Sequence, residues 1–147
     1  MVVAQPKGAN GWYGHAIWHG APIAAGSEPT RYTVGFTRRG TMRVYSNAVS
    51  QDQLLNDTIE NAMGCSGVLI QNGQANIPSA TTQTARVVMG QNMDTQEVII
   101  LCCGSYDNVQ HKGMTSKACA EILLNYGCDI AVELCEDISA GAVDKGS

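Results

Sequence analysis

ARVVMG (residues 85–90), EVIILCCG (97–104), GMTSKACAEILLNYG (113–127) and CDIAVEL (128–134) follow one another in the last third of the chain and decide its fold. The first, second and fourth are runs of apolar and β-branched residues of strand length. The third carries apolar residues at helical spacing. The order therefore predicts strand, turn, strand, loop, helix and strand.

The predicted helix has signals at both ends. Thr115 stands where an N-cap residue belongs, and Gly127 provides the left-handed stop. Between them an apolar stripe recurs at steps of three and four residues: Ala118, Cys119, Ile122, Leu123 and Tyr126. Charged residues gather at the end of the strand that follows, so we expect function to reside near residues 133–137.

The N-terminal half predicts a hairpin and a second helix. Residues 31–37 and 41–46 alternate in character and are joined by a turn, Arg38-Arg39-Gly40. Ser50 opens a capping box with Gln53, and the apolar stripe that follows predicts a helix ending at Gly64: Leu54, Leu55, Ile59, Ala62 and Met63. A short strand over residues 67–73 then runs into an Asn-Gly turn.

The opening of the chain is rich in glycine and aromatic residues and predicts a loop with one or two short strands. Its aromatic side chains form either a cap over the core or a pocket for a polar ligand. The pocket would be lined by Asn10, Trp12, Tyr13, His15 and His19. The two histidines are spaced as a metal clip on a helix, but the surrounding Gly and Pro residues oppose a helix, so we expect no metal and no cofactor.

Composition bounds the possible partners. With 147 residues we expect one domain, residues 1–147, of the α+β class: a central, largely antiparallel sheet with two packed helices. The net charge of −4 without a cluster of basic residues argues against nucleic acid as a partner.

Cys102 and Cys103 are adjacent in a predicted strand, which favours free thiols. No signal peptide or membrane span is recognisable, so we expect synthesis in the cytoplasm.

In this order the motifs NGWYG, LIQNG, ARVVMG, EVIILCCG, GMT and DIAVEL resemble the phosphodiester glycosidase family over nearly the whole chain. The resemblance implies hydrolysis of the bond between a sugar's anomeric carbon and a phosphodiester. Asn10 and Gly11 match the family's early Asn-Gly, and Arg86 and Gly90 match its Arg-x-x-x-Gly. Residues 113–115 match its Gly-Met-Thr helix entry. The resemblance therefore implies a carbohydrate or sugar-phosphate ligand. We expect its binding residues to be Asn10, Gly11, Trp12, Tyr13, Gly90 and Glu136.

The closing strand departs from the family pattern. Glu133 stands where the family has Asn, Cys135 stands where it has Asp, and residues 136–138 replace three glycines. Cys103 likewise replaces an Asp. Bulky residues cannot easily adopt the backbone of three glycines that crowd a ligand. This favours a module with lost or weak catalysis.

Two other hypotheses remain open. In the first, the protein is an active hydrolase in which Arg86 holds the phosphate while Glu133, Glu136 or Asp137 acts as acid or base. Glu133 could equally form a structural pair with Arg86. In the second, Cys103 or Cys135 acts as a nucleophile with His111 as its base.

The family pattern also extends beyond this sequence at both ends, so we expect a fold shortened at both termini with open sheet edges. A second copy of the chain or another protein could cover such edges. This favours a homo-oligomer or a component of a larger particle, such as a phage virion.

Overall fold

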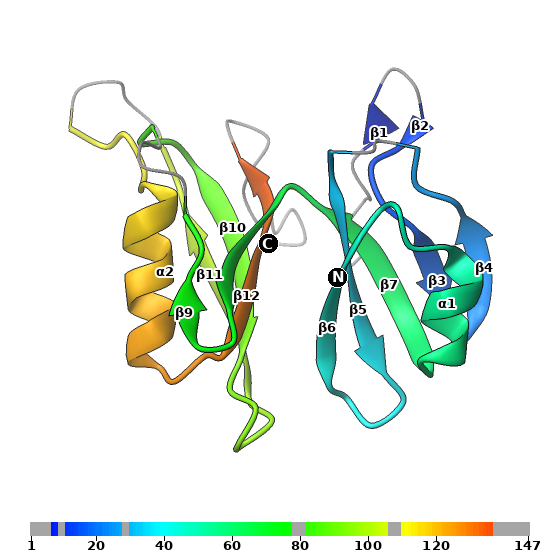
Figure 1. Ribbon diagram of the computed structural model, residues 1–147. Helices are drawn as coiled ribbons and strands as arrows, with labels where there is room; N and C mark the ends of the chain where they lie inside the picture. Colours follow the sequence, from blue (N-terminus) through cyan, green and yellow to red (C-terminus); the bar gives the residue numbers. More distant parts are fainter. Residues whose placement is uncertain (1–6, 9–10, 28–29, 78–81, 106–109, 137–147) are drawn as a thin grey trace, which may run out of the picture. The chain divides into compact units, whose positions relative to one another are not determined.

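The computed structural model describes residues 7–8, 11–27, 30–77, 82–105 and 110–136 (Figure 1). The chain divides into two units, residues 1–68 and 69–147. Within these described residues the strands form two five-stranded sheets and one two-stranded sheet, accompanied by two helices. The predicted α+β class with mostly antiparallel strands is confirmed, whereas the strands lie in two large sheets instead of one central sheet.

The sheet of the first unit has the strand order β4-β3-β7-β5-β6. Its strands are β3 (Ala16–Trp18), β4 (Ala21–Ala24), β5 (Tyr32–Thr37), β6 (Met42–Ser46) and β7 (Ile59–Cys65), and every pairing is antiparallel. The predicted hairpin over residues 31–46 is confirmed, with Gly40 at a φ of +84° in its turn. A separate pair, β1 (Lys7–Gly8) and β2 (Gly11–Trp12), precedes this sheet.

The second predicted helix is correct only at its start. Ser50 caps α1 (Gln51–Asn56) by accepting a hydrogen bond from the Gln53 amide at 3.2 Å. The helix ends at Asp57, and Thr58 adopts a φ of +64°. The residues expected to continue the stripe form β7 instead, because this strand pairs with both β3 and β5. Hydrogen bonds along both edges of β7 outweigh a local residue spacing that fits a helix.

The sheet of the second unit has the order β11-β10-β12-β8-β9. Its strands are β8 (Gly67–Gln71), β9 (Gln74–Ala75), β10 (Arg86–Gln91), β11 (Val98–Cys103) and β12 (Ile130–Glu136). Helix α2 (Ser116–Asn125) packs on β9, β10 and β12. The core lies between helix and sheet and consists of Leu69, Ile70, Val88, Cys119, Ala120, Leu123, Cys128 and Ala131.

The local signals of this unit are confirmed. Thr115 caps α2 through the Ala118 amide, and Gly127 follows the helix with a φ of +79°. Asn72 and Gly73 form the turn after β8 with φ angles of +52° and +75°. Among the described cysteines, Cys65, Cys102, Cys103, Cys119 and Cys128 are free thiols. Neither helix in the described part of the chain is long and apolar enough to span a membrane.

Candidate functional site

The candidate site is built around Arg86, the first residue of β10. In the sheet Arg86 pairs with Cys103 on β11 and with Glu136 on β12. The register of β10 and β12 shifts between Val87 and Val88, where Val88 pairs with Glu133. A β-bulge of this kind redirects the side chains beside it. The bulge lies next to Glu133, the residue of β12 whose carboxylate contacts Arg86.

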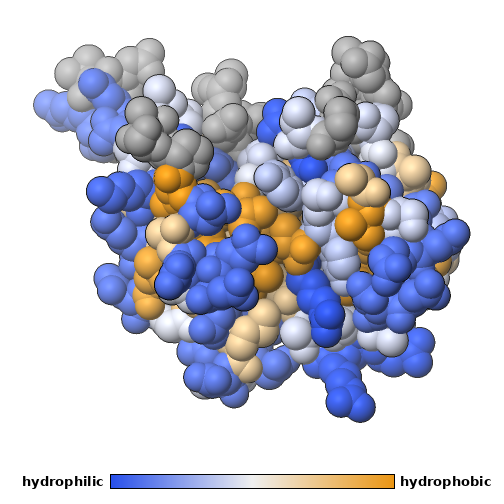
Figure 2. Space-filling view, in the orientation of Figure 1, coloured by the Kyte–Doolittle hydropathy of each residue, from blue (hydrophilic) through white to orange (hydrophobic). Residues whose placement is uncertain are grey.

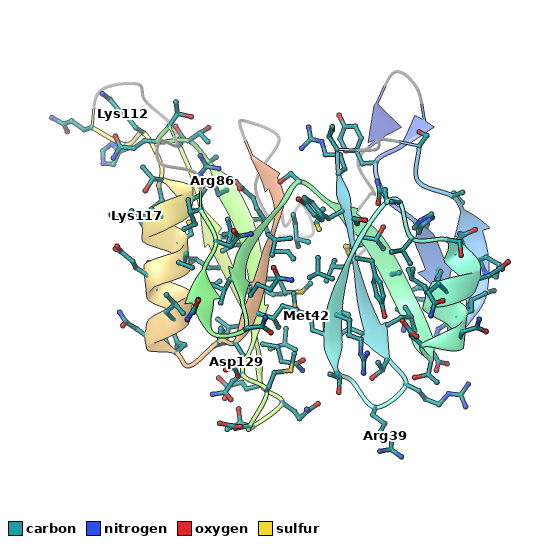
Figure 3. All side chains as sticks on the ribbon, in the orientation of Figure 1. Arg39, Met42, Arg86, Lys112, Lys117 and Asp129 are labelled. Atoms are coloured by element: carbon teal, nitrogen blue, oxygen red, sulfur yellow. The ribbon has the colours of Figure 1, made fainter. Side chains whose placement is uncertain are left out.

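Arg86 and Glu133 form a buried ion pair. Nη1 of Arg86 donates to Oε1 of Glu133, and the two side chains are only 2% and 8% exposed. Ser116, at the start of α2, donates its hydroxyl to Oε2 of Glu133 at 3.2 Å. Both carboxylate oxygens are therefore hydrogen-bonded, as a buried charge requires. Figure 3 shows Arg86 near the end of the sheet beside α2.

Backbone carbonyl groups bind the rest of the guanidinium. Nε of Arg86 donates to the Met114 carbonyl at 2.7 Å, and Nη2 donates to the Thr82 carbonyl at 2.6 Å. Each of the three guanidinium nitrogens thus donates to a protein acceptor. Through these bonds Arg86 links the start of β10 both to β12 and to the segment that leads into α2.

Gly113 brings the Met114 carbonyl to the arginine. Its φ is +87°, and a Cβ at this position would lie 2.0 Å from the Thr84 carbonyl oxygen. The close approach allows Thr84 and Met114 to exchange backbone hydrogen bonds of 3.3 and 3.0 Å. Glycine is therefore required here for the geometry of the chain around Arg86.

Two thiols lie beside the ion pair. Burial, with smaller contributions from the neighbouring Cys103 and Glu133, raises the pKa of Cys119 to about 12, although Arg86 offsets part of the rise. Cys103, which is half-buried, donates its thiol to the Thr84 carbonyl at 3.7 Å. A thiol with a pKa near 12 stays protonated at neutral pH, so Cys119 is a poor nucleophile.

Of the predicted catalytic residues, the structure brings Arg86 and Glu133 together. Glu136 contributes its backbone to the pairing with Arg86, whereas Asp137 lies outside the described residues. The pairing of Arg86 with Glu133 that the sequence suggested is confirmed. The catalytic roles of all these residues stay predictions.

The predicted binding residues are spread over both units. Gly11 and Trp12 form β2, and Asn10 lies outside the described residues. Tyr13 stacks against Arg31, whose guanidinium carbon lies 4.9 Å from the ring centroid. Gly90 is buried within β10, where an added Cβ would meet the Cys128 sulfur at 2.9 Å. Close packing alone accounts for a glycine at position 90.

The two histidines of the opening segment do not converge. His15 is buried: its Nε2 lies 2.7 Å from the Val49 carbonyl, and its Nδ1 accepts from the Gly26 amide. The ring of His19 instead packs edge-on against Trp18, with centroids 4.5 Å apart. Within the described ranges no three His, Cys, Asp or Glu side chains gather closely enough to hold a metal ion.

Three contributors to the site were not identified from the sequence: Thr82, Met114 and Ser116. The first two act through backbone carbonyl groups, which any residue type supplies. A hydroxyl residue directly after the helix cap was the available signal for Ser116. Its contact with Glu133 depends on how α2 packs against β12.

Comparison with known proteins finds a matching family model and similar solved structures. The model of the family described as phosphodiester glycosidase matches residues 4–134. A solved structure, the zebrafish N-acetylglucosamine-1-phosphodiester alpha-N-acetylglucosaminidase catalytic domain auto-inhibited by its pro-peptide, superposes with a TM-score of 0.70 at 18% sequence identity. The similarity covers 86% of this chain and 46% of that chain, so this sequence corresponds to less than half of the zebrafish structure. A comparison with curated proteins finds no match.

Proposed function

The chain belongs to the phosphodiester glycosidase family, and we propose that it is a member with little or no hydrolytic activity that binds a carbohydrate or sugar-phosphate ligand. Glycosidic bond cleavage needs a proton donor or acceptor, and a phosphodiester substrate also needs a cation near its phosphate. In this proposal Arg86 and Glu133 do not fill these roles. They hold the second unit together instead.

The observation that carries the proposal is the engagement of Arg86. Its guanidinium is 2% exposed and donates to Glu133, Met114 and Thr82. Because the residue is 2% exposed, a phosphate could reach the guanidinium only by displacing groups that now surround it, such as the Glu133 carboxylate. Breaking a buried ion pair leaves a carboxylate without its partner and costs about 3–5 kcal/mol. A catalytic cation is normally held in place with a donor still directed at the substrate.

The closing strand gives further support. Glu136 stands where the resemblance places the first of three glycines, and it pairs with Arg86 as a residue of β12. At this position the backbone continues a strand. A glycine-rich turn, in contrast, presents its amide groups to a ligand.

The alternative is an active hydrolase that uses Arg86 with Glu133 and Asp137. The burial of Glu133 favours it to some extent, because catalytic carboxylates are often found in dry surroundings. However, the carboxylate accepts hydrogen bonds from both Arg86 and Ser116. Both oxygens are thus bound within the protein, whereas a general acid or base has to direct one of them at the substrate.

Hydrolysis of an N-acetylglucosamine 1-phosphodiester tests the proposal directly. We expect the wild-type protein to release no N-acetylglucosamine above the buffer blank. The matched variants are Glu133→Gln, in the ion pair, and Glu121→Gln, which changes an exposed carboxylate on α2. Turnover by the wild type that persists in Glu121→Gln and disappears in a folded Glu133→Gln variant would establish the hydrolase instead.

We also propose that the chain assembles with further copies of itself, as a component of a larger particle would. The supporting feature is β11, which is at the edge of its sheet and exposes Val98 (41%) and Ile100 (48%). An exposed apolar edge strand can pair with the same strand of a second copy. Light scattering of the wild type and of Ile100→Lys tests this. A wild type that stays monomeric at high concentration rules it out.

A further inference from the structure

An open hollow of about 890 Å³ lies in the first unit, separate from the Arg86 centre. The turn and the flanking strands of the β5–β6 hairpin provide five of its lining residues, and three of these are arginines: Arg38, Arg39 and Arg43. Leu55 and Ile59, from α1 and the start of β7, add apolar side chains. Figure 2 shows hydrophilic residues over the lower end of this unit, where Figure 1 places the hairpin turn.

The hollow concentrates positive charge in an acidic protein. Three of the nine Lys and Arg residues of the chain line it, although the net charge is −4. Glu60 is the only carboxylate among the lining residues, which leaves an excess of two positive charges. Charges of one sign around a concave surface focus the field and raise the local concentration of a counterion.

Two of the arginines have polar or charged neighbours and remain exposed. Nε of Arg38 donates to Glu60 at 3.0 Å, while the Arg38 side chain stays 83% exposed. Arg43 is also exposed and lies near the hydroxyl of Tyr45, which donates to Asp57 at 3.0 Å. A ligand in the hollow can therefore reach both guanidinium groups.

The third arginine is unengaged. Figure 3 shows Arg39 at the tip of the hairpin turn, extending away from the sheet. Its side chain has no hydrogen-bond or ion-pair partner in the described part of the chain. A ligand can therefore recruit its guanidinium without breaking an existing contact.

We propose that this hollow binds the phosphate group of an anionic ligand through Arg38, Arg39 and Arg43. A planar guanidinium presents paired N–H donors that match two phosphate oxygens. Inorganic phosphate and a sugar phosphate share this group. The argument uses residues of the first unit only, so it stands or falls independently of the function proposed for the Arg86 centre.

Titration with sodium phosphate tests the proposal. Binding is monitored through the backbone amide resonances of isotope-labelled protein. Ionic strength is kept constant with sodium chloride. We expect saturable shifts of the amides of residues 38–43 and 58–60 at millimolar phosphate. Parallel titrations use glucose 1-phosphate and, as the uncharged probe, glucose. Tighter binding of glucose 1-phosphate would identify a sugar phosphate as the ligand, whereas equal affinities would mean that the site recognises phosphate alone; both results support the site.

The test variant is Arg39→Gln combined with Arg43→Gln, and the matched control is Lys117→Gln, which removes an exposed cation from α2. We expect the dissociation constant for phosphate to rise at least about tenfold in the double variant, which corresponds to about 1.4 kcal/mol. The control should bind as the wild type does. Arg39→Gln alone, an exposed change, covers the case in which the double variant unfolds and should weaken binding about threefold.

Three results would overturn the proposal. The first is the absence of saturable shifts at tens of millimolar phosphate. The second is binding that survives in the folded double variant. The third is an equal loss of affinity in Lys117→Gln, which would indicate general screening of charge instead of a site.

Discussion

Glu133→Gln should strongly destabilise the second unit. Glutamine has nearly the same shape and keeps one oxygen for Nη1 of Arg86, so packing changes little. However, the change removes the negative charge beside a guanidinium that is only 2% exposed. It also places an amide group on a side chain whose second oxygen accepts from Ser116. The arginine would remain buried without a counterion.

The magnitude follows from that burial. Removing one partner of a buried ion pair costs about 3–5 kcal/mol in the free energy of unfolding. The stability of a typical domain is only about 5–15 kcal/mol. At about 2–4 °C per kcal/mol for a chain of this size, the midpoint of thermal unfolding should fall by roughly 6–20 °C. The exposed control Glu121→Gln should change stability by less than about 0.5 kcal/mol.

Urea unfolding followed by circular dichroism measures the effect, with the double variant Arg86→Met, Glu133→Leu completing the comparison. Since the double variant removes both charges, it should be less destabilised than Glu133→Gln. A buried pair is expected to contribute a few kcal/mol to the free energy of unfolding. If Glu133→Gln lowers that free energy by less than about 1 kcal/mol, the structural role assigned to the pair is refuted.

Three further outcomes are expected. Leu123→Ala, at a fully buried position on α2, should cost about 2–5 kcal/mol, measured by urea unfolding; a smaller loss would mean that the helix packs loosely. Thr115→Ala should cost about 1 kcal/mol because it removes the cap bond to the Ala118 amide, and Thr115→Ser should restore most of it. Burial raises the pKa of Cys119 from 9.0 to about 12, so its contribution to stability is present below pH 9 and is lost as the pH rises toward 12. The fall in thermal midpoint over this range should be shallower in Cys119→Ala than in the wild type, and an equal slope would contradict the assignment.

Much of the second unit could be predicted from the sequence because its signals are local. The cap at Thr115, the glycine at 127 and the turn at Asn72-Gly73 each determine the backbone within a few residues. The pairing of Arg86 with Glu133 also followed from the resemblance and from strand alternation. Its burial did not, because it depends on how α2 and β12 pack around it.

Long-range pairing explains what the sequence could not predict. The spacing of Leu54, Leu55 and Ile59 fits a helix, yet Ile59 begins a strand that lies between β3 and β5. The sequence of that segment does not indicate which two strands it pairs with in the sheet. The division of the strands into two sheets has the same origin. Arg86 also binds the backbone carbonyl groups of Thr82 and Met114. Every residue type has such a group, so the sequence does not indicate these contacts.

The central claim is that the guanidinium of Arg86 is engaged by the protein and not by a ligand. Nuclear magnetic resonance of the arginine side chains in protein labelled with ¹⁵N-arginine tests it during titration with an N-acetylglucosamine 1-phosphodiester. We expect the Nε and Nη resonances of Arg86, assigned with Arg86→Lys, to stay unchanged at saturating ligand. A saturable shift of these resonances in the wild type would contradict the account and would place the phosphodiester at Arg86.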